Sequence, residues 1–392
     1  MIKKLSDVIL SSNTGLDAIK RAPIVEHDTG VRCLRIQDIS QSKVFDDWGF
    51  CDVEKRNYSK FKLMQGDIVI ARTGATVGVN MLVRSDLDAV YNNGLIRIKI
   101  DTTKTIPEYI YYNLQSHEYK GHINAISGGT ATQPNMKMKA LLEYEINLPD
   151  LKTQRTIADT LSALDARITE NKKINHHLEQ MAQAVFKSWF VDFEPWGGVM
   201  PSDWREGALS EIANIIMGQS PSGTSYNEDS NGTVFYQGRA EFGSRFPTRR
   251  LFTTEPKRMA AKGDILMSVR APVGDLNIAF ETCCLGRGLA GIQSNNNCQS
   301  FILYTMFALK QQLNMFNGEG TVFGSINKTD MANLPVIIPT NEVIRQFEEM
   351  VSPMDAAIEA NHAEICNLQT ERDFLLPRLI SGELSVANLT DK

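Results

Sequence analysis

The sequence lacks the features that mark membrane-embedded, exported or disulfide-stabilised proteins. Its longest apolar run, residues 301–309, is too short to cross a bilayer and is interrupted by Tyr304 and Thr305. The six cysteines form no Cys-x-x-Cys pair, and the basic start of the chain is not followed by the apolar segment of a signal peptide. We therefore expect a cytoplasmic protein with reduced thiols and no membrane contact.

The sequence also lacks the common catalytic motifs. It contains no Pro-Pro, which a methyltransferase uses to hold a flipped base, no GxxxxGK[ST] loop for ATP, and no HExxH or GxSxG motif. Its six histidines are scattered, which disfavours a zinc site. A loose nuclease pattern, Glu108 followed by Glu118-x-Lys120, falls in a segment predicted to be helical, whereas such sites place carboxylates on adjacent strands. We predict no catalytic centre, metal or cofactor in this chain.

The net charge of −5 is concentrated at one end of the chain. By count, residues 341–392 hold 4 Lys or Arg against 10 Asp or Glu, whereas residues 1–150 hold 19 against 18 and residues 205–340 hold 12 against 11. The two large segments are therefore near neutral, and basic patches can form on them despite the acidic total.

The second half of the sequence repeats the first at a shift of about 190 residues. Residues 164–171 (LDARITEN) align without a gap with residues 354–361 (MDAAIEAN). A looser match pairs residues 66–78 with residues 263–274, both beginning Gly-Asp-Ile. Such a repeat predicts two similar domains with pseudo-twofold symmetry. Further matched segments are 4–9 with 208–213, Gly128–Thr130 with Gly318–Thr321, and Asn135 with Asn327.

A long helix is predicted at the end of each repeat. Apolar residues alternate at spacings of four and three over about four heptads, a pattern that indicates a coiled-coil seam rather than a surface helix. Pro149 and Pro339 lie just before the two predicted starts. The predicted core positions are Ile157, Leu161, Leu164, Ile168, Asn171, Leu178 and Val185 in the first helix, and Phe347, Val351, Met354, Ile358, Asn361, Ile365, Leu368 and Leu375 in the second.

Asn171 and Asn361 occupy equivalent positions in the middle of the two seams. A buried Asn weakens a coiled coil but fixes its register, and in an antiparallel pair these two residues would face each other. The alternative is that each Asn simply ends the packed face.

The fold class is α+β, with two globular mixed α/β domains separated by a pair of long helices that form an antiparallel coiled coil. Gly-bounded β-rich runs occur at residues 67–71, 95–100 and 264–268, and helices are predicted at 107–114 and 300–309. The predicted organisation is a first globular domain at 1–150, a central helix at 151–194, a linker at 195–204, a second globular domain at 205–340, a C-terminal helix at 341–380 and a tail at 381–392.

Loops of both globular domains carry side chains suited to DNA. Arg is the usual bidentate partner of guanine, and Asn or Gln of adenine, while Lys and Arg also contact phosphates. Any one such residue is more often ordinary solvated surface, but both halves place Arg, Asn and Gln in corresponding Gly-rich turns. The candidates are Arg35, Gln37, Arg72, Thr73, Asn92, Asn93, Gln133, Asn135 and Lys137, and then Tyr236, Gln237, Arg239, Arg245, Arg249, Arg250, Arg270, Arg287, Asn327 and Lys328.

Over essentially its whole length the chain resembles the specificity subunit of type I restriction–modification systems. Residues 148–168 resemble the start of that family's spacer helix, with a Gln at position 154, and residues 184–195 resemble the end of its central spacer. The second spacer departs from the pattern, because Ile344 stands where Gln154 does.

The resemblance implies two target recognition domains, each reading one half of a split, asymmetric double-stranded DNA target. A helix of about 33 residues spans roughly 50 Å, enough to separate two readers by one duplex turn or slightly more. The resemblance further implies that two methyltransferase subunits dock on the helices and supply S-adenosylmethionine and adenine methylation. A motor–nuclease subunit with ATP and Mg²⁺ would complete the complex.

Three alternatives stay open. The chain could serve a fused nuclease–methyltransferase system that cuts on both sides of its target, which neighbouring genes would reveal. It could be a scaffold whose paired domains bind protein, which predicts no DNA affinity and no steep salt dependence. It could be a nuclease, which predicts metal-dependent cleavage of DNA by this chain alone.

Overall fold

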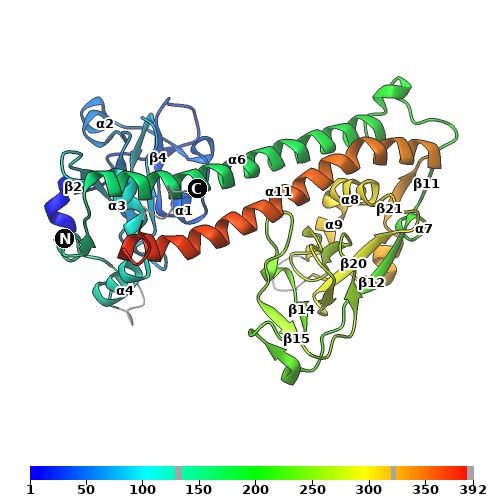
Figure 1. Cartoon of the computed structure of the whole chain (residues 1–392). Helices are drawn as coiled ribbons and strands as arrows, with labels where there is room; N and C mark the ends of the chain where they lie inside the picture. The colour runs from blue at the N-terminus through cyan, green and yellow to red at the C-terminus, as the bar shows by residue number, and fades with distance from the viewer. Residues whose placement is uncertain (129–134, 319–323, 386–392) are drawn as a thin grey trace. The chain divides into compact units, whose positions relative to one another are not determined.

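A computed structural model describes residues 1–128, 135–318 and 324–385 and divides the chain into two compact units. Unit 1 comprises Met1–Thr169 and the chain from Ile365 onward, and unit 2 comprises Glu170–Glu364. Each unit holds one globular domain and part of each of two long helices, α6 (Leu151–Phe190) and α11 (Asn341–Ser381), which Figure 1 colours green and orange to red.

Unit 1 is built on two four-stranded sheets with the orders β2-β9-β6-β7 and β3-β5-β4-β8, and a two-stranded sheet of β1 and β10. Neighbouring strands are antiparallel except β4 and β8, which are parallel. The strands are β1 (Ile2–Lys4), β2 (Ile9–Thr14), β3 (Ile24–Val25), β4 (Arg32–Leu34), β5 (Phe50–Cys51), β6 (Asp67–Ala71), β7 (Asn80–Leu82), β8 (Ala89–Tyr91), β9 (Leu95–Ile100) and β10 (Glu145–Asn147).

Short helices cover the sheets of unit 1. They are η1 (Leu5–Val8), α1 (Ile36–Ser40), η2 (Phe45–Asp47), α2 (Lys55–Phe61), α3 (Pro107–Asn113), α4 (His117–Ile126) and α5 (Met138–Leu142).

Unit 2 repeats this topology with one additional strand. Its sheets have the orders β12-β20-β17-β18, β13-β15-β14-β19-β16 and β11-β21, and β14 and β19 form the parallel pair. The strands are β11 (Arg205–Ala208), β12 (Ala213–Met217), β13 (Tyr226–Asn227), β14 (Thr233–Tyr236), β15 (Leu251–Thr253), β16 (Met259–Ala260), β17 (Ile265–Ser268), β18 (Leu276–Ile278), β19 (Cys283–Leu285), β20 (Leu289–Ser294) and β21 (Pro335–Ile338).

Unit 2 also carries short helices outside the long pair. They are η3 (Glu194–Trp196), α7 (Leu209–Ile212), η4 (Gly223–Ser225), η5 (Arg239–Glu241), α8 (Gln299–Ala308), α9 (Lys310–Asn314), η6 (Met315–Asn317) and α10 (Lys328–Ala332).

One inner strand of the sheet that packs against the helices, β6 in unit 1 and β17 in unit 2, is buried on both faces. Along β6, Ile68 and Ile70 join the core beneath the helices, whereas Val69 and Ala71 join the core between the two sheets. Side chains alternate between the two faces of a strand, so a strand buried on both sides is apolar throughout. This packing explains the uninterrupted apolar run that predicted the strand, and β17 shows the same alternation.

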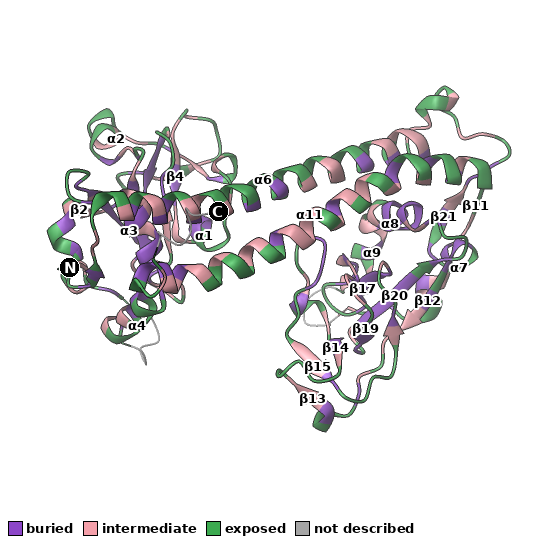
Figure 2. Ribbon diagram, viewed as in Figure 1, coloured by how far each residue is buried: buried purple, intermediate pink, exposed green. Residues whose placement is uncertain are grey.

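The long helices pair antiparallel within each unit. In unit 1 the Arg372 guanidinium contacts the Asp165 carboxylate at 3.0 Å, and in unit 2 the Asn171 amide donates to Glu364 at 2.9 Å. Residue numbers thus rise along α6 as they fall along α11, and buried residues recur along both helices (Figure 2). Of the predicted core positions, Ile157, Leu161, Ile168, Asn171, Phe347, Val351, Ile358 and Ile365 are buried, and Leu164, Leu178, Val185, Met354, Asn361, Leu368 and Leu375 are partly buried.

Asn171 and Asn361 do not pair with each other, contrary to the expectation from their equivalent positions. The Asn361 amide donates to the Asn175 side-chain oxygen at 2.8 Å, while Asn171 donates to Glu364. The Asn171 oxygen is buried and has no hydrogen-bond partner among the described residues. Each amide nitrogen thus donates to a polar residue about one turn from the equivalent Asn of the facing helix.

Candidate nucleic-acid interface

In each unit, the loops that carry the candidate residues follow a pair of parallel strands. Leu34 at the end of β4 pairs with Tyr91 at the end of β8, and Tyr236 at the end of β14 pairs with Leu285 at the end of β19. Parallel strands end at the same edge of a sheet, so the residues that follow lie side by side. The equivalent positions are Arg35 with Gln237, Gln37 with Arg239, Asn92 with Gly286, and Asn93 with Arg287.

A third loop joins this edge in both units. In unit 1 the Arg72 amide donates to the Gly94 carbonyl at 2.9 Å, and in unit 2 the Val269 amide donates to the Gly288 carbonyl at the same distance. The loops that follow β6 and β17 are therefore attached to the parallel strand pair in the same way.

Isolated β-bridges fix the register of this third loop. Thr73 bridges to Asn135, and Arg270 bridges to Ser325. Thr73 is therefore the equivalent of Arg270, and Arg72 is the equivalent of Val269. The unit 1 loop is one residue longer, and the sequence alone did not show where to place the gap.

The same register corrects the sequence match of Asn135 with Asn327. Asn135 is equivalent to Ser325, so Lys137 and not Asn135 corresponds to Asn327. The Asn327 side chain accepts from the Asp330 amide at 2.9 Å and caps α10, which explains this Asn by helix formation. Lys137 and Asn135 are both exposed.

In unit 2 five of the candidate residues line one hollow, which we call the arginine hollow. Its four guanidinium groups come from three separate chain segments, so the tertiary structure gathers arginines on one surface of a nearly neutral domain. The residues lining it include Gln237, Arg239, Glu241, Arg250, Ser268, Arg270 and Arg287.

Two of these arginines are held by carboxylates. Arg239 contacts Asp275 at 3.0 Å, and Arg250 contacts Glu241, whose side chain is 1% exposed. One oxygen of Glu241 has no hydrogen-bond partner among the described residues.

The other two arginines of the hollow are available to a ligand. Arg270 and Arg287 are exposed, and neither forms an ion pair within the described ranges of the chain. A guanidinium that is not already bound to a carboxylate can direct its donors at a base edge or a phosphate.

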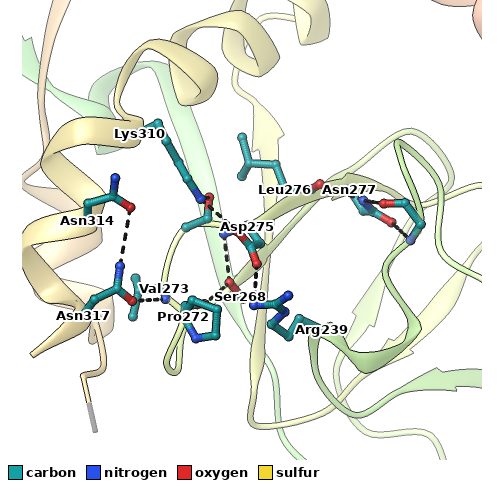
Figure 3. A network of polar contacts seen from close by, with 12 residues as sticks. Arg239, Ser268, Pro272, Val273, Asp275, Leu276, Asn277, Lys310, Asn314 and Asn317 are labelled. Atoms are coloured by element: carbon teal, nitrogen blue, oxygen red, sulfur yellow. Dashed lines mark hydrogen bonds and ion pairs between the residues drawn. The ribbon is translucent and has the colours of Figure 1, made fainter. Parts of the chain in front are cut away.

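The loop that presents Arg270 is fixed by polar contacts (Figure 3). The Ser268 hydroxyl donates to the Pro272 carbonyl at 2.7 Å and accepts from the Asp275 amide at 2.9 Å. The Val273 amide donates to the Asn317 side chain. Because the backbone on both sides of Arg270 is held, this loop is preorganised for binding.

The same edge of unit 1 carries mostly neutral side chains. Gln37 and Asn93 are exposed, and Arg35 contacts the buried Asp38 at 3.1 Å. Thr73 is partly buried. Gln133 lies outside the described residues.

Arg72 and Asn92 are partly shielded from solvent in unit 1. The Arg72 Nε and the Asn92 Oδ1 are buried, and neither has a hydrogen-bond partner among the residues that the structure describes. Their remaining polar atoms keep both residues among the candidates.

Several candidates are placed away from this edge or serve the fold. Arg245 is 6% exposed and contacts Glu179 and Asp355, so we remove it from the interface. Tyr236 is buried, and burial raises its pKa. Arg249 is exposed and contacts Glu281. Lys328 is exposed at the start of α10.

Sequence reasoning missed the residues that support the hollow. Asp275 contacts both Arg239 and Lys310, the latter at 2.8 Å, and Glu241 holds Arg250. No sequence signal indicates them, since these partners lie 9 to 36 residues apart in the chain.

The residues of the loose nuclease pattern lie on helices. Glu108 belongs to α3, and Glu118 and Lys120 belong to α4. The described residues include no group of three His, Cys, Asp or Glu arranged to hold a metal ion. No helix of the described chain is both long and apolar enough to cross a membrane.

Two mixed α/β domains of one topology, each built onto paired antiparallel helices and presenting different polar loops, define a two-domain recognition protein. The family model described as type I restriction modification DNA specificity domain matches residues 35–180 and 201–369. The chain belongs to this family of type I restriction–modification specificity subunits.

Two relatives support the assignment along the full length. A chain of Methanocaldococcus jannaschii named as the MjaX type I restriction enzyme specificity subunit is 29% identical, over 98% of this chain and 93% of that one. The HindI specificity subunit of Haemophilus influenzae is 23% identical over 83% and 88%. The crystal structure of the type I restriction–modification S subunit from M. genitalium has the same fold, with a TM-score of 0.64 at 17% identity over 97% and 96%.

Proposed function

We propose that each unit reads one half of a split, asymmetric DNA target. The observation that carries this proposal is the pair of equivalent loop edges. The strand order, the parallel pair and the bridges agree between the units, while the side chains at the edge differ.

The chemistry of the two edges fits two different readers. One edge presents Arg35, Gln37 and Asn93, and the other presents a hollow with four arginines and Gln237. Two half-sites of different sequence present different patterns of donors and acceptors at their base edges. Reading them therefore requires the same backbone scaffold with different exposed side chains, as the two units have.

The chain contributes recognition and no catalytic centre of its own. The relatives are named as subunits of type I restriction enzymes, and we extend this to two methyltransferase subunits docked on the helix pair and to motor–nuclease subunits bound through the complex. S-adenosylmethionine, ATP and Mg²⁺ would then be bound by those partners.

Methylome sequencing tests the proposal. The chain is expressed in cells with the methyltransferase subunit of the same locus, and the control omits this chain. We expect a new N6-methyladenine motif in two halves, with one adenine per half on opposite strands. No new motif, with both proteins folded and co-purifying, would contradict the proposal and favour a protein-binding scaffold.

The helix pair would set the gap between the halves. Removing one heptad from each of α6 and α11 shortens each helix by roughly 10 Å at 1.5 Å per residue. We expect the number of unspecified base pairs in the motif to change while both half-sites keep their sequences. An unchanged gap would contradict this role of the helices.

A further inference from the structure

The equivalent positions at the two loop edges differ in a systematic way. The first loop exchanges an Arg and a Gln between units, since Arg35 and Gln37 correspond to Gln237 and Arg239. The other two positions replace neutral side chains by arginine, because Thr73 and Asn93 correspond to Arg270 and Arg287.

A comparison of equivalent positions can distinguish residues that read bases from residues that bind the DNA backbone. Phosphate contacts position a protein without carrying sequence information, and the phosphate backbone is chemically the same at both half-sites. Residues that hold the backbone can therefore be alike in two equivalent readers, whereas residues that read bases must differ wherever the half-sites differ. Thr73 and Arg270 on one loop, and Asn93 and Arg287 on the other, differ between the units, as residues that read bases must.

We propose, on the basis of the function proposed above, that Arg270 and Arg287 each contact a guanine in the half-site read by unit 2. Guanine presents two acceptors, O6 and N7, in the major groove, and a guanidinium binds both at once. The unit 1 residues at these positions, Thr73 and Asn93, cannot make that bidentate contact with two donors on a planar cation.

The surroundings of the two arginines support this role. Arg239 and Arg250 line the same hollow but are bound to Asp275 and Glu241, so part of their donor set is already used. Arg270 and Arg287 are exposed, and the described residues offer them no carboxylate at ion-pair distance.

The backbone that carries each arginine is also fixed. The Arg270 loop is held by Ser268 and by the amide bond from Val273 to Asn317. The Arg287 amide donates to the Ser220 hydroxyl at 3.2 Å. A contact that discriminates between bases needs this rigidity, because a mobile cation would bind phosphates of any sequence equally well.

The test exchanges each arginine for its unit 1 counterpart in the full chain with its methyltransferase subunit. Arg270→Thr and Arg287→Asn are compared with the wild type by methylome sequencing. We expect each variant to relax one G·C position of the same half-site, with a loss of discrimination of roughly 5- to 150-fold at that position. The other half-site should be unaltered. Arg258→Thr, which removes an exposed arginine of unit 2 that does not line the hollow, should leave the motif intact.

A second variant separates misfolding and phosphate binding from base reading. Arg270→Lys keeps the charge but loses the rigid planar fork of the guanidinium, so we expect methylation to persist with the G·C preference weakened. Three outcomes would overturn the guanine contacts but leave the proposed function standing. The motif could be unchanged in the variants, the half-site that changes could contain no G·C pair at the altered position, or methylation could fall equally at all sites. Absence of any split motif would overturn both.

Discussion

The two units attach their globular domains to the long helices with the same pair of side chains but with arginines from different places. The Tyr112 hydroxyl donates to Asp165 at 2.8 Å in unit 1, and the Tyr304 hydroxyl donates to Asp355 at 2.8 Å in unit 2. Burial raises the pKa of both tyrosines, so both hydroxyls are protonated at neutral pH.

The arginine bound to each of these aspartates differs in origin and in exposure. Arg372 of α11 contacts Asp165 and is 27% exposed, whereas Arg245 comes from a loop of the globular domain, contacts Asp355 and is 6% exposed. The position of the charge is retained in the repeat, while the segment that supplies it is not.

A second pair of contacts shows the same substitution of partners. The Gln154 oxygen accepts from the Thr105 hydroxyl at 2.7 Å and from the Ile106 amide at the start of α3. In unit 2 Ile344 replaces this Gln, and Glu348, one turn later, accepts from the Ser300 and Phe301 amides at the start of α8. Each unit thus satisfies the free amides at the start of its helix from the long helix beneath it. The comparison teaches that the repeat conserves contacts more closely than residues.

The largest expected effect is that of Arg245→Ala. Removing this buried guanidinium leaves Glu179 and Asp355 without their cation, and breaking a buried pair costs about 3–5 kcal/mol. Arg372→Ala should cost only about 1 kcal/mol in unit 1, because its pair is more exposed. Amide hydrogen exchange, followed separately for β14 in unit 2 and β4 in unit 1, measures the loss of stability in each unit. Equal costs would show that the two attachments are energetically alike.

The next effect tests the equivalence of Gly78 and Gly274. Both have positive φ, +88° and +84°, and an added Cβ would lie 2.8 Å from Ile123 or 2.7 Å from Leu313. We expect each change to Ala to cost about 2–4 kcal/mol, from backbone strain and overpacking together. Gly263→Ala is the control, since it has positive φ but open space around it, and should cost about 1–2 kcal/mol. Thermal unfolding measures all three, and a Gly78 variant no worse than the control would exclude the steric term.

Gln154→Ala should destabilise unit 1 by about 1–3 kcal/mol. It leaves the Thr105 hydroxyl and the Ile106 amide buried without their acceptor. Gln180→Ala on the same helix removes an exposed Gln and should change the free energy of unfolding by less than about 0.5 kcal/mol. Urea unfolding checks the pair, and an equal effect of both changes would refute the capping role.

The smallest effect is a pH dependence confined to unit 2. Burial raises the pKa of Glu348, although the Ser300 and Phe301 amides oppose the shift. A carboxyl whose pKa is raised in the folded state binds protons more tightly there, so its contribution to stability falls as pH rises from about 4.3, the unfolded value, through the raised pKa.

Glu348→Gln should remove that dependence, and Gln154 provides a neutral counterpart in unit 1. Hydrogen exchange of α8 as a function of pH measures the contribution. A variant with the pH profile of the wild type would show that Glu348 does not titrate in this window.

Much of the fold could be predicted from the sequence. The apolar runs that predicted strands coincide with β6 at Asp67–Ala71 and β9 at Leu95–Ile100, and the helix predicted at 107–114 appears as α3. The central helix ends at Phe190 rather than at residue 194, because Phe193 adopts positive φ and a short 3-10 turn follows.

Less of the candidate site could be predicted. Arg245, Arg249 and Arg250 belong to one Arg-rich loop, and nothing in the sequence distinguishes them. In the structure Arg245 is buried against the helices, whereas Arg249 and Arg250 are exposed. No sequence pattern indicated Asp275 and Glu241 as the carboxylates that bind Arg239 and Arg250 in the hollow.

The sequence by itself determined the repeat, the heptad seams and the residue types available to its loops. These are properties of local spacing, and period-2 and period-3.5 patterns act through neighbours in the chain. Only the tertiary structure decided which arginines are exposed, which are held by carboxylates, and that Thr73 rather than Arg72 is the counterpart of Arg270. The reason is that burial and bridge register depend on contacts between segments far apart in sequence, and a shift of one residue reverses the face that a side chain presents.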